Sequence, residues 1–417
     1  MEQRLIVHLL FLGVCSISAT AAGAVPVTSA VVTDTSPDYG DTLSGDWGGR
    51  RSAMHDAGYD WKIVYKLDLL DKVSSPGNKI YGLDNLDIKL ALDGEKIAGI
   101  NGSSALLYVL SNRGGKPVAH GNHSAGLDNI ETPENANTTK LYEAWLQQLF
   151  FDGRLSVLAG LYDLNSEFYV TGPASLFIQP IYGIGAEMAD TGKNGPSVFP
   201  TTSLALRTKV ETAGYYIQAV TLDGVPGDPN NPHGNHVQLN RGDGALNVIE
   251  GAIPLGTDAH DNKLALGTWR YTVHVDDLLD PLVKRISHGY YVLLEKALRD
   301  KTGGNEPGIS GFVRAGKADG DTAQFDMTWS AGLVFSGLFG RGQDQSGVAY
   351  AQERNGEKWR TYSGNPTVFE RSLELTFRYQ LKPGMVLQPT VQFLVNQNSN
   401  TARGDSWWLG MRAEFSL

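Results

Sequence analysis

The feature that most constrains the fold is a strict alternation of apolar and polar residues in long segments. Between residues 371 and 381, apolar side chains occupy every second position: Leu373, Leu375, Phe377, Tyr379 and Leu381. The positions between them are polar and include Glu374 and Arg378, and residues 406–417 repeat the pattern. Because successive side chains of a β-strand point to opposite faces, each segment predicts a strand with one apolar and one polar face.

Two architectures use such strands. A soluble β-sandwich turns the apolar faces inward onto a second sheet, whereas an outer-membrane β-barrel turns them outward to lipid and keeps the polar faces around a wet lumen. Periodicity alone does not distinguish the two. Strands of about ten residues, aromatic residues at segment ends and a final residue, Leu417, on the apolar parity favour the barrel.

Composition excludes several other classes of protein. After the N-terminus no run of about twenty apolar residues exists to span a bilayer as a helix, and the mean hydropathy is −0.22. The 49 glycines and 17 tyrosines suit many turns and aromatic girdles. Acidic residues outnumber basic ones by 45 to 35. We therefore expect no nucleic-acid partner, because phosphate binding needs clustered lysine and arginine.

The first 24 residues read as a secretory signal peptide. Arg4 precedes an apolar core at residues 5–14, and small residues end the segment at Ala24. The single cysteine, Cys15, lies inside this segment, so we expect no thiol in the exported protein. Residues 25–42 are rich in Thr, Ser, Asp and Pro without periodicity, and they predict a mobile N-terminal arm.

The rest of the chain, residues 43–417, contains no linker and is predicted to form one domain. Its alternating segments predict about fourteen to sixteen antiparallel strands, at residues 61–70, 86–92, 105–110, 141–150, 155–161, 203–211, 215–222, 246–254, 263–273, 288–298, 309–317, 325–339, 348–353, 371–381, 385–395 and 406–417. Long and short connections are intermixed, as in a bacterial barrel of even strand number.

Two connections are too long for tight hairpins. Residues 116–140 are polar and predict an extracellular loop. The stretch that ends at Thr202 is rich in glycine, proline and aromatic residues such as Phe177 and Tyr182. So many apolar side chains do not remain in water, and we expect this loop to fold into the barrel and narrow the pore.

Two motifs resemble a known family. The first runs Leu-Ser-Gly-Asp-Trp-Gly-Gly-Arg at residues 43–50, before a segment, 51–58, that predicts one or two helical turns. The second runs Gly-Leu-Tyr-Asp-Leu-Asn-Ser-Glu-Phe at residues 160–168. Both are similar to the carbohydrate-selective outer-membrane porins of the OprB type, and the resemblance covers nearly all of residues 43–417.

The resemblance implies a transmembrane antiparallel β-barrel of about sixteen strands in the outer membrane of a Gram-negative cell. It also implies passive, selective diffusion of small carbohydrates, glucose-like sugars or polyols, into the periplasm. An unselective diffusion porin on the same fold is the first alternative, and an exported soluble β-sheet carbohydrate-binding protein is the second. The partners expected are small sugars and outer-membrane lipid, and the apolar belt is equally compatible with a homotrimer.

A sugar that crosses a pore needs hydrogen-bond partners for its hydroxyls and an aromatic surface for its ring face. Candidates for such a constriction are a strand-end arginine and groups in the second motif: Arg113, Asp163, Asn165, Glu167 and Phe168. The alternative is that Arg113 pairs with a loop carboxylate and the motif only shapes the loop. Other charged residues on the polar parity predict a wall field, namely Lys66, Asp87, Lys89, Glu374, Arg378 and Arg412.

Other chemistry has weaker support. His120 with His123, and His233 with His236, are spaced three apart but lie in Gly-rich loops without a third ligand, so no metal site is expected. Ser406 follows Gly404 and Asp405 as in part of an esterase motif, but no catalytic-base motif accompanies it. The chain carries no phosphate-cradling or dinucleotide glycine motif. We therefore expect neither a cofactor nor an enzyme.

Overall fold

The computed structural model describes residues 39–73, 80–114, 126–132, 137–212, 214–255, 262–299, 308–399 and 404–417. The predicted signal peptide and residues 25–38 of the predicted arm lie outside the described residues. Within the described part, no helix combines the length and the apolar character needed to cross a bilayer.

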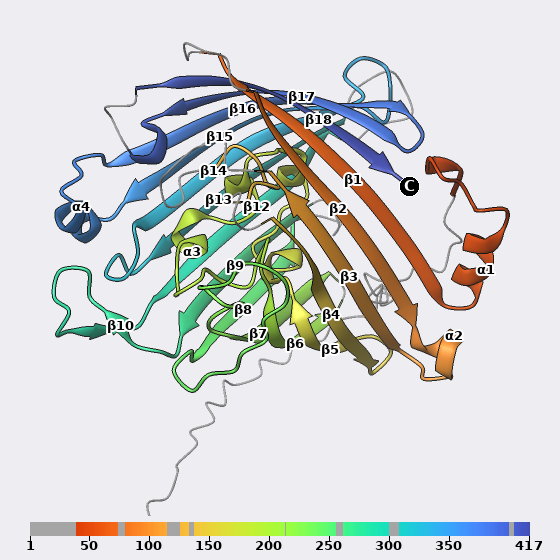
Figure 1. Ribbon diagram of the computed structural model, residues 1–417, viewed down its shortest axis with the longest axis horizontal. Helices are drawn as coiled ribbons and strands as arrows, with labels where there is room; N and C mark the ends of the chain where they lie inside the picture. The colour runs from red at the N-terminus through yellow and green to blue at the C-terminus, as the bar shows by residue number, and fades with distance from the viewer. Residues whose placement is uncertain are drawn as a thin grey trace, which may run out of the picture.

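A closed barrel of antiparallel strands makes up most of the described residues (Figure 1). Each strand pairs with the next along the chain, and the first pairs with the last, so the sheet has no free edge. The sixteen barrel strands in this part of the chain are β1 (Tyr59–Lys72), β2 (Ile80–Asp93), β3 (Ser103–Arg113), β4 (Thr138–Phe150), β5 (Leu155–Tyr162), β6 (Ser203–Thr212), β7 (Tyr215–Asp223), β8 (Ala245–Pro254), β9 (Asn262–Tyr271), β12 (His288–Arg299), β13 (Gly308–Ala318), β14 (Phe325–Ser336), β15 (Gln345–Asn355), β16 (Phe369–Lys382), β17 (Met385–Val395) and β18 (Ser406–Ser416). The predicted fold class is confirmed.

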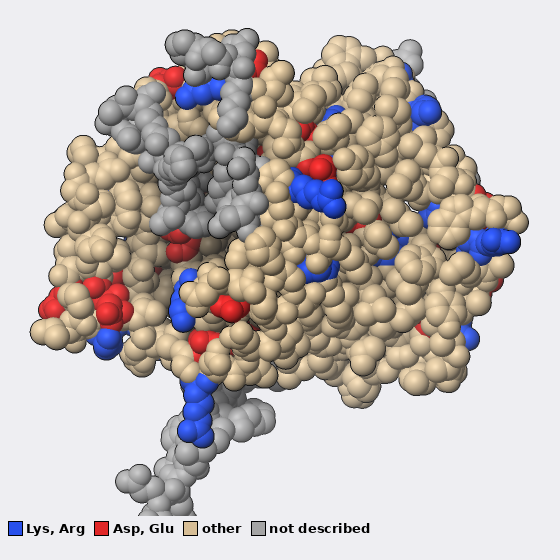
Figure 2. Space-filling view, in the orientation of Figure 1, with Lys and Arg blue, Asp and Glu red and all other residues tan. Residues whose placement is uncertain are grey.

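The apolar faces of the strands point outward. Leu146, Leu266 and Leu409 are 70%, 62% and 48% exposed, whereas inward neighbours such as Gln147 and Trp408 are buried. Figure 2 shows a largely uncharged surface, with isolated charged groups, over the strands labelled β1 to β3 in Figure 1. This orientation contradicts the soluble alternative, which needs the same side chains packed together in a dry centre.

The two ends of the barrel differ. One end has short connections, including the helix α2 (Gly94–Ala98), and carries the N-terminal helix α1 (Arg50–Asp56). The other end has longer loops, including the small hairpin β10 (Val275–Asp276) with β11 (Lys284–Arg285) and the helix α4 (Glu357–Ser363). Short turns lie on the periplasmic side of such barrels and long loops outside the cell, so we assign the ends accordingly.

The motif at residues 43–50 joins the N-terminus to the end of the last strand. Leu43 N donates to Ser416 O at 2.8 Å. Asp46 Oδ1 accepts from Ser52 N at 2.8 Å and so satisfies one of the free N–H groups in the first turn of α1. Tyr39, at the end of the predicted arm, is only 5% exposed because it packs against Arg51, whose guanidinium lies 4.2 Å from the ring centroid. The predicted N-terminal helical turns are confirmed.

Residues 163–202, between β5 and β6, fold into the barrel and form what we call the constriction loop. The loop contains short helical turns: η3 (Leu164–Ser166), η4 (Pro173–Leu176), η5 (Pro180–Tyr182) and α3 (Ala186–Ala189). Its aromatic side chains pack against the inner wall, where the rings of Phe177 and Phe312 are 6.0 Å apart. Tyr169 packs against Tyr291 on β12 with ring centroids 4.1 Å apart. The predicted inward-folded loop is confirmed.

Candidate functional site

Three glutamates on the barrel wall hold the backbone of the constriction loop. Glu250 on β8 accepts from Tyr169 N at 2.9 Å, and Glu295 on β12 accepts from Gly172 N at 2.6 Å. Glu374 on β16 accepts from the backbone N–H groups of residues 178 and 179 at 2.8 and 3.0 Å. A carboxylate that accepts backbone N–H bonds in a buried site makes strong, charge-assisted contacts. These contacts fix how far the loop projects into the lumen.

Two arginines on the barrel wall form ion pairs with acidic side chains of the segments that fold into the lumen. Arg207 on β6 pairs with Glu167, with 2.8 Å between Nε and Oε2. Tyr162 OH donates to the same oxygen at 2.6 Å. Arg412 on β18 donates to Asp68 at 2.6 Å and to Asp128 at 3.0 Å, which ties the inner segment 126–132 to the wall.

Burial indicates where the lumen stays open. Under the constriction loop, the inward side chains of Glu250, Glu374 and Gln392 are fully buried. Opposite, on β1, Lys62 is exposed and the side chain of Lys66 retains 24% of its exposure. The loop therefore fills the lumen on the β8–β17 side and leaves a passage along β1 and β2, where Lys89 is also only half-buried.

We call the inward side chains of this passage the polar lane: Lys62, Lys66, Asp87, Lys89 and Tyr108. Lys66 Nζ lies 3.0 Å from Asp87 Oδ2, and Tyr108 OH donates to Asp87 Oδ1 at 2.6 Å. Lys89 Nζ lies 4.3 Å from the centroid of the Tyr108 ring. The lane therefore presents lysine donors to the passage, with the buried Asp87 carboxylate and Tyr108 ring, each 7% exposed, directly behind them.

All six predicted wall charges lie on the inward parity. Lys66, Asp87 and Lys89 lie together in the polar lane. Glu374 and Arg412 bind inner loops, as described above. Arg378 lies toward the periplasmic end, 3.4 Å from Glu414.

Four of the five predicted constriction residues come together at the base of the constriction loop. Asp163 accepts from Asn165 N at 2.8 Å and caps η3, and its own N–H donates to Glu143 at 3.1 Å. Asn165 Nδ2 donates to the carbonyl oxygens of Phe168 and Gly183 at 3.1 and 3.0 Å. Phe168 is fully buried, so its ring does not face the pore. Together with Glu167, these residues hold the shape of the constriction loop. This arrangement corresponds to the alternative interpretation of the motif, in which it only shapes the loop.

Arg113 lies apart from the other four. Its neighbour Asn112 faces the lumen and is buried, so the alternation along β3 turns Arg113 to the outer face, where it is exposed. It stands in register with Asp84, another outward residue. Arg113 is therefore not a candidate for the lumen constriction.

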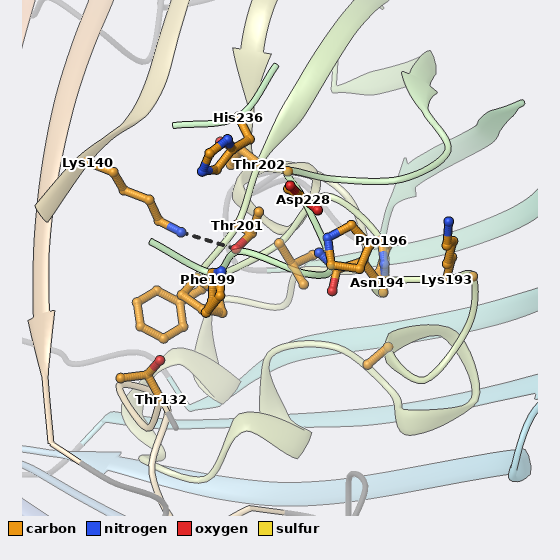
Figure 3. Close-up of a pocket in the computed structure, with 18 of the residues that line it drawn as sticks. Thr132, Lys140, Lys193, Asn194, Pro196, Phe199, Thr201, Thr202, Asp228 and His236 are labelled. Atoms are coloured by element: carbon orange, nitrogen blue, oxygen red, sulfur yellow. Dashed lines mark hydrogen bonds between the residues drawn. The ribbon is translucent and has the colours of Figure 1, made fainter. Parts of the chain in front are cut away.

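A cavity of about 660 Å³ lies above the passage, between the inner segment 126–132, the constriction loop and residues 227–237 (Figure 3). Lys140 on β4 points into it and donates to Thr201 Oγ1 at 3.1 Å. Phe199 offers an aromatic face, and Asp228 and His236 project from the opposite loop. We call this cavity the vestibule. Sequence reasoning missed Lys140 because it assigned this residue to the predicted loop 116–140, whereas β4 begins at Thr138.

The paired loop histidines serve turn geometry where the structure describes them. His236 Nε2 lies 2.8 Å from His233 O, and His233 Nδ1 lies 3.0 Å from Asn137 O. His120 and His123 lie outside the described residues. In the part of the chain that the structure describes, no three His, Cys, Asp or Glu side chains cluster as metal ligands.

Comparison with known proteins points to one family. Residues 78–417 match the family described as carbohydrate-selective porin, OprB family. Porin B of Pseudomonas aeruginosa is 24% identical over 335 residues, which cover 74% of this chain and 73% of that protein. The high-pH structure of Pseudomonas putida OprB superposes with a TM-score of 0.78 at 19% identity, over 92% of this chain and all of that chain.

Two further solved structures share the fold. The low-pH structure of the same Pseudomonas putida OprB gives a TM-score of 0.60 at 18% identity, over 91% of this chain and all of that chain. The outer-membrane channel DcaP of Acinetobacter baumannii gives 0.51 at 11% identity, over 87% of this chain and 98% of that chain. Because the family match spans most of the sequence and the fold is that of a porin, this chain belongs to the OprB family of carbohydrate-selective porins of the outer membrane.

Proposed function

We propose that this porin lets glucose-sized neutral sugars and polyols diffuse passively into the periplasm along the polar lane. The family match supports selective carbohydrate diffusion. The observation that carries the proposed route is the grouping of Lys66 and Lys89, which stay partly exposed, in front of the buried Asp87 carboxylate and Tyr108 ring. Channels and porins of this kind need no energy source, because solute moves down its own gradient.

The lane explains how a sugar could enter and leave quickly. Each hydroxyl gives up hydrogen bonds to water and needs replacements of similar strength inside the pore. Lys66 retains 24% of its side-chain exposure while its partner Asp87 retains 9%, so the Lys66 ammonium can exchange a bound water for a sugar hydroxyl without leaving the ion pair. Lys89, whose ammonium lies 4.3 Å from the centroid of the Tyr108 ring, offers a second donor. Binding is then strong enough to admit a sugar and weak enough to release it.

Liposome swelling tests selectivity. We expect glucose and a polyol to permeate several-fold faster than an amino acid of equal size. The variant Lys66→Met removes a donor and the counter-ion of Asp87, so it should lower this ratio. Lys209→Met is the matched control, since Lys209 is also inward and paired, with Glu211 at 2.8 Å, but lies outside the lane. Equal rates for all solutes of one size would instead support the unselective alternative.

We further propose that residues 1–24 are removed on export. The charged start, apolar core and small residues up to Ala24 support this. N-terminal sequencing of protein extracted from outer membranes should then begin at Val25. A mature N-terminus at Met1 would contradict the proposal.

We also propose that the porin is a homotrimer. The support is a polar patch on the outer face of β2 to β4, toward the extracellular end, formed by Asp84, Ser111, Arg113 and Thr139. Thr139 Oγ1 donates to Ser111 Oγ at 2.8 Å, and Asp84 is in register with Arg113. Charged groups on a lipid-facing surface are costly, and a neighbouring subunit would cover them. Light scattering of the detergent-solubilised protein should give three copies, and Arg113→Glu should lower that number, whereas a monomer would refute the proposal.

A further inference from the structure

Among the residues that the structure describes, Lys140 is a buried cation without a carboxylate partner. Its side chain extends inward from β4 into the vestibule and is 6% exposed. Its ammonium donates to Thr201 Oγ1 at 3.1 Å, and within the described residues it forms no ion pair. An ammonium has three N–H donors, so two remain for a group in the vestibule.

Two other inward lysines differ from Lys140 in this respect. Lys66 pairs with Asp87 at 3.0 Å, and Lys263 pairs with Glu295 at 3.6 Å. A buried charge is costly unless a group of opposite charge or several hydrogen bonds compensate for lost water. At Lys140 the described protein supplies one hydroxyl oxygen. The remaining compensation must come from whatever occupies the vestibule.

Three of the acidic side chains that line the same cavity make contacts elsewhere. Asp128 accepts from Arg412 at 3.0 Å and from Ile130 N at 2.9 Å. Glu131 accepts from the backbone N–H groups of residues 127 and 128 at 2.6 and 3.2 Å. Asp228 accepts from Asn230 N at 2.9 Å within its own loop. None of these contacts involves Lys140.

The rest of the vestibule suits a sugar ring. Its volume of about 660 Å³ falls in the range of about 300–1,000 Å³ that is typical of small-molecule sites. In Figure 3 the Lys140 side chain points toward Thr201, with Phe199 on one side and His236 on the other. Phe199 offers a ring face. Asn194 Nδ2 donates to Pro226 O at 2.6 Å, so Asn194 offers its amide oxygen. Thr202 Oγ1, which donates to Tyr142 O, offers only an acceptor for a sugar hydroxyl. A ligand with both a sugar ring and a negative charge would satisfy all of these groups together.

We infer that the vestibule is an entrance site for monosaccharides that carry a carboxylate, such as hexuronic acids, and that Lys140 Nζ binds the carboxylate. This inference rests on the proposed function, because it places a sugar-acid site at the mouth of the same channel. A single ammonium matches the single charge of a carboxylate. A phosphate monoester carries close to two negative charges at neutral pH, which one ammonium balances only in part, and the only hydrogen-bond partner of Lys140 Nζ among the described residues is the neutral Thr201 hydroxyl.

Calorimetry on the detergent-solubilised full chain tests the site directly, with glucuronate, its neutral analogue glucuronamide and glucose as ligands. We expect glucuronate to bind at least about tenfold more tightly than glucuronamide, the value expected for a charge-assisted hydrogen bond. Lys140→Met should abolish the preference, and Lys140→Arg should retain most of it. Lys193→Met is the matched control, because Lys193 lines the same cavity and should leave the preference intact.

Several results would overturn the inference. Equal affinity of the wild-type protein for glucuronate and glucuronamide would do so without any variant, even if Lys140→Met does not fold. An equal loss in Lys193→Met would show a diffuse field instead of a site. Acetate that binds as tightly as glucuronate, or a sugar phosphate that binds more tightly, would show a different ligand class. Liposome swelling is a separate measurement: equal rates for glucose and amino acids would refute the proposed function while leaving the calorimetric result in place.

Discussion

Arg51 shows how one buried side chain can close a barrel of this size. Its guanidinium donates to Leu417 O at 3.1 Å and to Trp61 O at 2.7 Å, so it links the last residue of the chain to the first strand. The same group lies 4.2 Å from the centroid of the Tyr39 ring. It therefore joins both ends of the described chain at the seam where β1 meets β18.

Arg51→Ala should destabilise the folded barrel. The change removes these hydrogen bonds and leaves buried carbonyl oxygens without donors, which predicts a loss of about 2–4 kcal/mol in the free energy of unfolding. Urea titration of the protein in lipid vesicles, followed by tryptophan fluorescence, measures this loss. Arg50→Ala is the control because Arg50 is exposed. Similar midpoints for the two variants would show that Arg51 does not hold the seam.

Single residues were the hardest features to predict from the sequence. The position of Arg113 at a strand end suggested a pore residue, yet the alternation with inward Asn112 assigns it to the outer face. The alternation of side chains along a strand was therefore enough to place Arg113 correctly. It could not place Phe168, because a loop has no regular period. The Phe168 ring is buried only through its packing inside the barrel.

At the scale of elements, the constriction loop depends on wall carboxylates more than on its own short helices. Glu374→Leu removes the acceptors of the N–H groups of Ile178 and Gln179. Each unsatisfied buried N–H costs about 1–3 kcal/mol, so this part of the loop should detach from β16. Planar-bilayer recordings should show larger and noisier conductance, and swelling assays should show a lower ratio of glucose to amino-acid rates.

Glu414→Leu is the matched control for Glu374→Leu. Glu414 faces the lumen on β18 and pairs with Arg378, but it makes no hydrogen bond to the constriction loop. If both variants change the conductance equally, loss of a lumen charge is the cause and detachment of the loop is not. If neither changes it, the wall glutamates do not set the width of the pore.

The extracellular loops carry an ion-pair cluster that links three elements. Asp277, beside β10, lies 2.9 Å from Arg285 on β11 and also pairs with Lys358 on α4. Lys358 contacts Asp321, in the loop between β13 and β14, at 2.8 Å. The hydrogen bonds from Lys358 and Arg285 hold the pKa of Asp277 well below its usual range. The cluster therefore keeps α4 against its neighbouring loops at neutral pH.

This cluster predicts a pH dependence. A depressed carboxylate pKa stabilises the folded form at every pH above the ordinary aspartate value of about 3.9, and the stabilisation is lost as the pH falls through the lower pKa. Hydrogen exchange of α4, corrected for intrinsic rates, should stay constant from neutral pH to about 4 and rise only below that. Asp277→Asn should raise it already at neutral pH, whereas Asp280→Asn in the same loop should not. A rise near pH 6 in the wild type would refute the assignment.

Strands and short helices differed in how well the sequence predicted them. Every predicted strand is present, with ends displaced by a few residues, because each side chain of a barrel strand faces either lipid or lumen. The helices α2 and α4 and the hairpin of β10 with β11 were not predicted. The signal for α2 was there, since Asp93 caps its first turn and Gly99 ends it in the left-handed region, but five residues give no period to detect.

At the scale of the whole molecule, function depends on one division of space: apolar side chains outside and polar ones inside. Pairing of β1 with β18 closes the sheet, so that no strand edge is left unpaired. The constriction loop narrows the wide barrel to a passage lined by polar side chains. Neither property belongs to a single strand. The sequence predicts this division, because apolar and polar residues alternate along each strand. It does not predict the path of the passage, because that path depends on which part of the wall the constriction loop covers.

The same division predicts how the barrel responds to a charge on its outer face. Leu266, in the middle of β9, is 62% exposed in the absence of lipid. Leu266→Arg should lower the free energy of unfolding in a bilayer by about 2–4 kcal/mol, the cost of an arginine at the bilayer midplane. Leu266→Phe keeps the site apolar and should change it little. Urea unfolding in vesicles measures both variants, and in detergent the difference should shrink because micelles let the charge reach water. If the arginine variant is as stable in the bilayer as the phenylalanine variant, Leu266 on β9 does not face lipid. Only a lipid-facing position is exposed in the bare protein and also destabilised by a charge in the bilayer.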